Sequence, residues 1–144
     1  MKIAFACDHA GFDRKVELMD YLKNKGYEVT DLGCFSAESS DYPDYGHLLA
    51  DYVSSGKSDI GISLCGSGNG INMTANKHQG IRSALCWNPE IASLAKRHNN
   101  ANIIAIPARF VTSDETREIA DSFLNAEFEG GRHQKRIDKI PLTK

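Results

Sequence analysis

Short apolar runs alternate with helically spaced apolar residues from one end of the chain to the other. The apolar runs predict five buried strands, at residues 2–7, 27–32, 60–64, 81–86 and 102–106. The segments between and after them carry apolar residues at helical spacing, which predicts helices near residues 12–22, 43–53, 71–77, 89–98 and 119–124. Strands that alternate with helices in this way predict an α/β fold, with a parallel sheet covered by helices on both faces.

The chain reads as a single domain. Its 144 residues contain no internal repeat, no low-complexity tract and no linker long enough to separate two domains. A domain of this size buries about 68–70% of the surface that its unfolded chain exposes, so it needs no metal or disulfide to fold. Gly130-Gly131 ends the last long helix, and a basic tail begins at Arg132.

Composition narrows the functional classes. Hydrophobic residues make up 41% and charged residues 25%, as in ordinary soluble proteins, and the formal net charge of −2 argues against a nucleic-acid partner. No apolar run has the length of a signal-peptide core or a membrane span. The four cysteines (Cys7, Cys34, Cys65 and Cys86) form no CxxC pair, which indicates reduced thiols in the cytoplasm. Since no Cys/His cluster has ligand spacing, we expect no metal.

The segment Cys-Gly-Ser-Gly-Asn-Gly at residues 65–70 is the strongest candidate for chemistry. It follows the third predicted strand and opens a helix, so its backbone N–H groups can form a concave site for an anion or a developing oxyanion. We expect this setting to lower the pKa of Cys65 from roughly 8.5 toward neutrality. A dinucleotide fingerprint needs glycine at Ile71, and a P-loop needs lysine at Ser67, so neither motif is present. The alternative is a tight strand-to-helix turn with a structural cysteine.

Other polar residues lie at or near predicted strand and helix ends. Asp8 and His9 end the first strand, and Arg109 follows the fifth, so these side chains can meet at one sheet edge. His98 closes a helix, where a histidine more often interacts with the helix dipole than acts in catalysis. Arg132 and Arg136 lie at i, i+4, which suits a phosphate as well as it suits a solvated basic helix.

Seven segments of the chain resemble the ribose-5-phosphate isomerase B family, which also includes the galactose-6-phosphate isomerase subunits. They are Cys-Asp-His-Ala-Gly-Phe (7–12), Asp-Tyr-Pro (41–43), Cys-Gly-Ser-Gly-Asn-Gly (65–70), Ala-Asn-Lys (75–77), Gly-Ile-Arg (80–82), His-Asn-Asn-Ala-Asn (98–102) and Glu-Gly-Gly-Arg-His-Gln-x-Arg (129–136). The resemblance implies a Rossmann-like, three-layer sandwich with five parallel strands, and no metal or organic cofactor. It also implies a homodimer, or a dimer of dimers, with active sites shared between subunits and a tail (131–144) that packs on the partner.

The resemblance also assigns roles to residues. It implies that Cys65 removes the proton next to the sugar carbonyl and that His98, assisted by Asp8, opens the sugar ring. The expected holders of the cis-enediolate are Gly66, Ser67, Gly68, Asn69 and Gly70, and those of the phosphate are His9, Arg109, Arg132 and Arg136. By analogy, His98, Asn99 and Arg109 come largely from the neighbouring subunit, and the other site residues form one side together.

Two positions depart from related sequences, and three alternative functions stay open. Ala75 stands where one branch of the family has a glutamate base, which assigns the base role to Cys65, and Ser67 stands where many relatives have threonine. The alternatives are an isomerase of a hexose 6-phosphate (allose or galactose), a nucleotide-binding module without catalysis, and a thiol phosphatase. The phosphatase is disfavoured because six residues separate Cys7 from Arg14, whereas its phosphate loop needs five.

Overall fold

The computed structural model describes residues 1–142 and contains one five-stranded parallel sheet. The strands are β1 (Lys2–Cys7), β2 (Glu28–Asp31), β3 (Ile60–Cys65), β4 (Ser83–Leu85) and β5 (Ile103–Pro107), and their order across the sheet is β2-β1-β3-β5-β4. All four pairings are parallel. The predicted α/β class and the five parallel strands are therefore confirmed.

Helices occupy every connection between the strands. They are α1 (Phe12–Asn24), α2 (Tyr42–Ser54), α3 (Asn69–Ala75), α4 (Pro89–Arg97), α5 (Ser113–Asn125) and α6 (Arg132–Ile137), with a short 3₁₀ helix, η1, at His9–Gly11. Their starts follow local chemistry: the Asn88 side chain accepts the Ile91 N–H at the start of α4, and Thr112 and Glu115 form a capping box on α5. Within residues 1–142, no helix has the length and apolar character that a membrane span requires.

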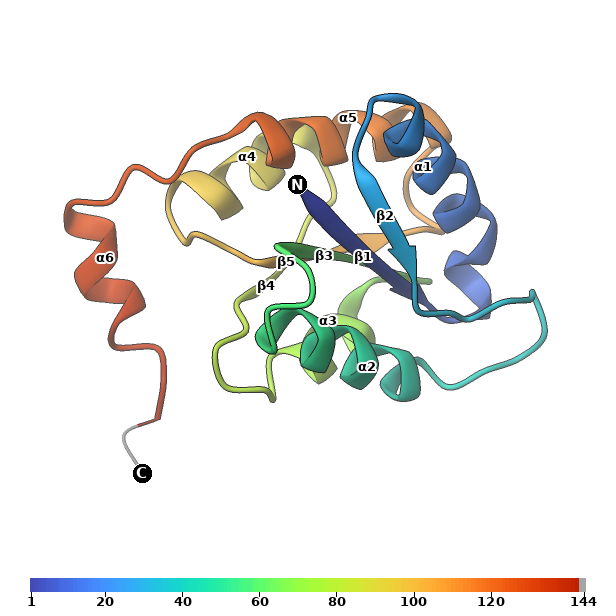
Figure 1. Ribbon diagram of the computed structural model, residues 1–144, viewed down its shortest axis with the longest axis horizontal. Helices are drawn as coiled ribbons and strands as arrows, with labels where there is room; N and C mark the ends of the chain where they lie inside the picture. Colours follow the sequence, from blue (N-terminus) through green and yellow to red (C-terminus); the bar gives the residue numbers. More distant parts are fainter. Residues whose placement is uncertain (143–144) are drawn as a thin grey trace.

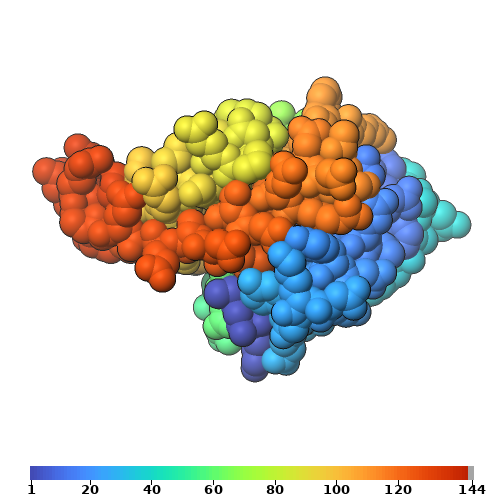
Figure 2. All heavy atoms as spheres, turned by 90° about the horizontal axis from the view of Figure 1, so that it is seen from above, coloured from blue at the N-terminus to red at the C-terminus, as the bar shows by residue number. Residues whose placement is uncertain are grey.

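The helices form two layers around the sheet. In Figure 1, α1, α4 and α5 cover one face of the sheet, and α2 and α3 cover the other. Helix α6 stands apart from both layers, and Figure 2 shows it projecting beyond α4 at one end of the molecule. The last two residues of the expected tail, 143 and 144, lie outside the described residues.

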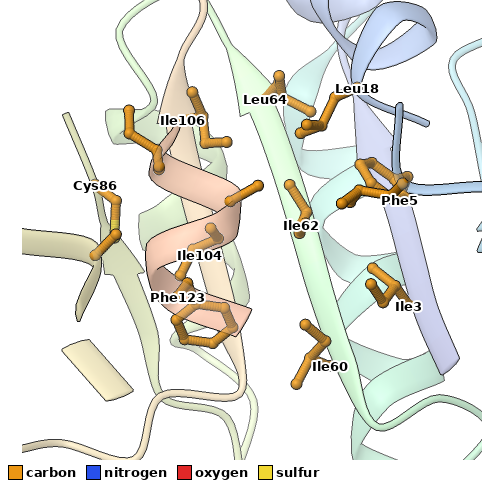
Figure 3. Packing of buried hydrophobic residues seen from close by; sticks show 14 of the residues in the cluster. Ile3, Phe5, Leu18, Ile60, Ile62, Leu64, Cys86, Ile104, Ile106 and Phe123 are labelled. Carbon is orange, nitrogen blue, oxygen red and sulfur yellow. The ribbon is translucent and has the colours of Figure 1, made fainter. Parts of the chain in front are cut away.

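The larger core lies between the sheet and the layer of α1, α4 and α5. Figure 3 shows side chains from β1, β3 and β5, including Phe5, Ile62 and Ile104, packed together with Leu18 and Phe123 from the helices. These five side chains are almost completely buried. At about 1.5–3 kcal/mol for each large apolar side chain, this burial fixes the strand ends that carry the polar residues.

The connections after β1 and β3 diverge, and this divergence places the candidate site. The chain leaves β1 through α1 toward β2, and it leaves β3 through α3 toward the opposite side of the sheet. In open α/β sheets, ligands bind in the crevice that such a divergence opens at the carboxyl ends of the strands. Cys7 pairs with Leu64 across β1 and β3, so residues 8–9 and 65–70 lie next to each other.

Candidate active site

The loop after β3 is shaped by glycines whose neighbours leave no room for a side chain. Gly68 has a φ of +78°, and a side-chain carbon added there would lie 2.5 Å from Leu85 Cδ1. Gly70 lies directly against the ring of Tyr42. Both glycines are therefore required where the loop turns into α3, which begins at Asn69. The turn aims backbone N–H groups at the end of β3, as the sequence suggested.

Cys65 is the last residue of β3 and is only 4% exposed. Burial raises the pKa of its thiol above the ordinary value, and the negative charge of Asp8 raises it further. The backbone N–H groups of Gly68, Gly70 and Ile71 act in the opposite direction but do not outweigh burial. The expectation of a Cys65 pKa near neutrality is therefore wrong for this structure. The sequence showed the N–H groups but not how completely the sulfur is removed from water.

Ser67 presents an exposed hydroxyl beside the loop. Its Oγ accepts the backbone N–H of Asn69 at 3.3 Å, so the hydroxyl hydrogen stays available to a ligand. Asn69 is exposed as well, whereas Gly68 is buried and Gly66 and Gly70 are half-buried. The loop thus offers a donor side chain on the solvent side and backbone donors beneath it.

Asp8 is buried at the end of β1 and holds the following turn. Its Oδ1 accepts the backbone N–H groups of Ala10 at 3.0 Å and Gly11 at 3.3 Å. These contacts start η1, so Asp8 has a structural function as the N-cap of this turn. The carboxylate also lies close enough to Cys65 to influence the thiol, as the pKa of Cys65 shows.

His9 is fixed by Ser40, from the loop that leads into α2. The Ser40 N–H donates to His9 Nδ1 at 3.1 Å, and the His9 N–H donates to Ser40 Oγ at 3.0 Å. Nδ1 also lies 3.2 Å from the Ser40 carbonyl oxygen, so it donates or accepts according to the tautomer of the ring. Both ring contacts with Ser40 involve Nδ1, so they leave Nε2 available to a ligand. The sequence contained no signal for Ser40.

Arg109 lies against the Cys65 loop of its own chain. Its backbone N–H donates to Gly66 O at 3.1 Å, and a side-chain carbon added at Gly66 would lie 3.3 Å from its guanidinium Nη1. The pairing of β5 with β3 brings Arg109 beside this loop, at the sheet edge where the sequence placed it with Asp8 and His9. The resemblance implied that Arg109 comes largely from the neighbouring subunit, and this division between subunits stays a prediction.

His98 and Asn99 lie at the opposite end of the strands from Cys65, where the strands begin. They follow α4, which runs back from the carboxyl ends of the strands, and the Asn99 carbonyl accepts from Arg82 Nε, just before β4, at 2.9 Å. Pro107 pairs with Cys65 and Ile103 with Gly61, so the amino and carboxyl ends of these strands are separated by four residues, about 13 Å. One chain therefore does not bring His98 to Cys65.

The tail joins the group around His98. The His133 ring stacks on the His98 ring, with centroids 4.3 Å apart and planes at 15°. Arg132 and Arg136 lie on the same short helix, both exposed, and Arg136 Nη1 donates to the Arg132 carbonyl at 3.3 Å. Within one chain, the two tail arginines thus accompany His98, and Arg109 accompanies Cys65. The resemblance implied the other grouping for these three arginines, and which subunit supplies each of them to a site stays a prediction.

Glu129 is a polar residue of this second group whose role the sequence did not reveal. Its Oε2 accepts from Arg97 Nε at 2.8 Å, and its Oε1 lies 3.4 Å from His133 Nε2 and 3.8 Å from His98 Nε2. The Arg97 hydrogen bond holds the pKa of Glu129 below its ordinary value, and the two histidines act in the same direction. Glu129 is the first residue of the motif at 129–136, but the sequence predicted no contact partner for it.

Cys7, the nucleophile that a thiol phosphatase would need, is completely buried. Its Sγ lies 3.7 Å from Cys34 Sγ, and burial raises its pKa to about 12. A thiol in this setting stays protonated and has no contact with solvent. The phosphatase alternative therefore loses its nucleophile.

Comparisons with known proteins agree with this architecture. The model of the ribose/galactose isomerase family matches residues 3–140. Ribose-5-phosphate isomerase B of Escherichia coli (strain K12) is 45% identical over 139 residues, which are 96% of this chain and 93% of that protein. The structure of ribose-5-phosphate isomerase B of Clostridium thermocellum is 48% identical, with a TM-score of 0.96 over 97% of this chain and 95% of that one. The enzyme of Mycoplasma genitalium, solved with bound ribulose-5-phosphate, is 45% identical, with a TM-score of 0.92 over 96% of this chain and 93% of that one.

Proposed function

This chain belongs to the ribose/galactose isomerase family, and from that premise we propose that it interconverts ribose 5-phosphate and ribulose 5-phosphate. The observation that carries the proposal is the thiol of Cys65 beside the N–H groups of Gly68, Gly70 and Ile71. Removing a proton next to a carbonyl requires a base and stabilisation of the enolate oxygen, and this loop supplies both. Residues 1–144 form one isomerase domain that works without a metal or an organic cofactor.

Two copies of the chain build each site. Cys65, Asp8 and Arg109 lie at the carboxyl edge of the sheet, whereas His98 and Arg136 lie at the other end of the molecule. A two-fold axis that places the carboxyl edge of one copy against the α4–α6 end of the other completes both sites at once. The assembly is therefore a homodimer, or a dimer of dimers, in which the projecting tail packs on the partner.

The reaction proceeds in two stages. His98, assisted by Asp8, moves a proton from the anomeric hydroxyl to the ring oxygen, which opens the aldose and frees its carbonyl. The Cys65 thiolate then takes the proton from C2, and the electron pair moves to the carbonyl oxygen to give a cis-enediolate. The hydroxyl of Ser67 and the backbone N–H groups of residues 66–70 hold its oxygens. The proton of the C2 hydroxyl then passes to O1, the C2–O electron pair forms the new carbonyl, and C1 takes the proton from Cys65, which gives the ketose and regenerates the thiolate.

The phosphate binds to Arg109 and His9 of one subunit and to Arg132 and Arg136 of the other. The i, i+4 spacing of the two tail arginines directs both guanidinium groups to one side of α6, where they can each make bidentate hydrogen bonds. His9 contributes Nε2, which its contacts with Ser40 through Nδ1 leave free. Asn99 contacts the sugar from the same subunit as His98.

The Arg136→Ala variant should raise KM for ribose 5-phosphate by about 10- to 100-fold, with a smaller effect on kcat. The lost hydrogen bonds to a charged group are worth about 1.5–3 kcal/mol and contact a part of the substrate that does not react. Steady-state kinetics test this result, with Lys135→Ala as the control, because Lys135 is an equally exposed cation next to Arg136 on α6. An unchanged KM in Arg136→Ala would remove this residue from the phosphate site.

The value of kcat/KM should rise with pH by about tenfold per unit through the neutral range and continue to rise into alkaline pH. The base must be deprotonated, kcat/KM reports the free enzyme, and burial raises the pKa of Cys65, so the thiolate fraction is small at neutral pH and grows as pH increases. Asp8→Asn should move the rising limb to lower pH, since the charge of Asp8 contributes to the raised pKa. A rate that is already constant at pH 7 would contradict the protonated resting thiol.

Hexose phosphates are the second candidate substrates, because the matching family model covers ribose and galactose isomerases alike. A hexose 6-phosphate has one more carbon between the reacting end and the phosphate, so the span from Cys65 to the tail arginines of the other subunit decides the preference. Values of kcat/KM for ribose 5-phosphate, allose 6-phosphate and galactose 6-phosphate test the proposal, and we expect the pentose to have the highest.

We place the enzyme in the cytoplasm. The four cysteines are buried free thiols, and the closest pair, Cys7 and Cys34, keeps its sulfur atoms 3.7 Å apart without a bond. Reduced thiols are typical of that compartment.

A further inference from the structure

Two histidines and a glutamate meet where the tail leaves the body of the molecule. His98 ends α4, Glu129 lies in the connection between α5 and α6, and His133 lies in the first turn of α6. Their nearest ligand atoms all lie within 4.8 Å of one another. The sequence showed no metal-ligand spacing here because 30 residues separate His98 from the motif that contains the other two.

The geometry suits a small cation with a preference for nitrogen. Both histidines direct Nε2 toward the same carboxylate oxygen, Glu129 Oε1, at 3.4 and 3.8 Å. Tetrahedral zinc, with bonds of about 2.0–2.1 Å, separates its ligand atoms by roughly 3.3–3.5 Å. Rotation of the His98 ring out of the stack would direct its Nε2 and that of His133 to one ion together with Glu129 Oε1.

Hydrogen bonds with Arg97 orient the Glu129 carboxylate toward the two histidines. Arg97 Nε holds Glu129 Oε2 at 2.8 Å, and the Glu129 N–H donates to the Arg97 carbonyl at 3.0 Å, so Oε1 is the oxygen that faces the histidines. A partner on the second oxygen is the usual way in which proteins orient a metal-binding carboxylate. In the single chain the side chains of His98 and Glu129 are 35% and 39% exposed. In the proposed dimer His98 faces the substrate site, so an ion can reach the group by the path that the substrate takes.

We propose that His98, Glu129 and His133 form a binding site for a divalent transition-metal ion, and that Zn²⁺ is the ion it takes. Two imidazole nitrogens and one carboxylate oxygen form the His₂Glu set that zinc accepts, with its fourth position open to water or substrate. The ion is an inhibitor rather than a cofactor, because it occupies the Nε2 atom with which His98 would exchange protons. This consequence rests on the proposed function, whereas the site itself does not.

Competition with a chromogenic zinc chelator tests the site without any measurement of activity. The full chain is titrated with Zn²⁺ near neutral pH, alongside Glu129→Gln, His133→Gln and the matched control His78→Gln. His78 lies in the turn after α3, where its Nε2 is 2.7 Å from Nδ1 of His47 on α2 and its Nδ1 is 3.2 Å from Asp51 Oδ1. Cys65→Ala controls for zinc binding to the thiol, and gel filtration and far-ultraviolet circular dichroism show whether each variant is folded.

We expect one zinc ion per chain, a loss of affinity of about tenfold or more in Glu129→Gln and His133→Gln, and unchanged affinity in His78→Gln and Cys65→Ala. Equal affinity in folded His133→Gln and wild-type protein, or no competition with the chelator, would overturn the site. Zinc should also slow turnover reversibly, with recovery on addition of EDTA. Binding at these residues without inhibition would overturn the inhibitory consequence and count against the role of His98.

Discussion

Cys65→Ala should lower kcat by about 10³-fold or more while the protein stays folded. The sulfur is the group proposed to take the proton from the sugar carbon, and a positioned acid or base contributes about 10²–10⁴-fold. The substitution leaves the N–H groups of Gly68, Gly70 and Ile71 in place, so binding of the substrate should change little. Formation of ribulose 5-phosphate measures the rate.

The fold should tolerate this change because alanine fits the same buried strand end. Cys65 is 4% exposed, and removing one buried sulfur costs about 1 kcal/mol. Cys86→Ala is the matched control, since Cys86 is another fully buried thiol whose pKa is raised to about 12, and it follows β4 rather than β3. Near-normal turnover in Cys65→Ala, or an equal loss in Cys86→Ala, would exclude Cys65 as the base.

His98→Asn should lower turnover of ribose 5-phosphate by about 10²–10⁴-fold, because most of this aldose is a closed ring that His98 is proposed to open. Ribulose 5-phosphate cannot form a five-membered ring, since its O5 carries the phosphate. The proton on its C1 can therefore be removed without His98. In deuterated water, the His98→Asn variant should still replace this C1 proton of ribulose 5-phosphate with deuterium, whereas the Cys65→Ala variant should not.

This exchange separates the two roles within one experiment. Glu127→Gln is a suitable control for the substitution, because Glu127 is an exposed charged residue in the same connection as Glu129 but outside the His98 group. If His98→Asn loses exchange as completely as Cys65→Ala, His98 acts in proton transfer at carbon or in substrate binding, and ring opening is not its role.

The strands and helices were predictable because burial leaves a period in the sequence. The apolar run at residues 2–7 became β1 with the same bounds, and the run at 60–64 became β3 with one residue more. The run at 81–86 became only the three-residue strand β4, because Ile81 N–H bonds back to His78 O in a turn and Asn102 Oδ1 takes the Arg82 N–H. Periodicity shows which residues are apolar, not where local hydrogen bonds end a strand.

Part of the candidate site could likewise be predicted from the sequence, and part of it could not. The carboxyl edge of a parallel sheet follows from chain direction alone, so Asp8 and the Cys65 loop could be placed together from the sequence. The raised pKa of Cys65 could not, because it depends on how many atoms from distant segments exclude water from the sulfur. The contacts of His9 with Ser40 and of His98 with Glu129 likewise join residues 31 positions apart, and no pattern in the sequence predicts them.

The position of Arg109 shows a further limit. Its place beside Gly66 depends on β5 being the neighbour of β3, whereas chain order alone would put β4 there. The resemblance grouped Arg109 with His98 and the tail arginines with Cys65. Within one chain, Arg109 instead lies beside the Cys65 loop, and the helix of the tail arginines lies beside His98.

Mixing the two inactive variants tests the shared site most directly. When Cys65→Ala and His98→Asn subunits are unfolded together and refolded, half of the dimers are hybrids, and one of the two sites in each hybrid combines an intact thiol with an intact imidazole. We predict recovery of about a quarter of wild-type turnover from two samples that are each almost inactive. No recovery from well-folded hybrids would mean that both residues serve the same chain, or that one of them serves no site at all.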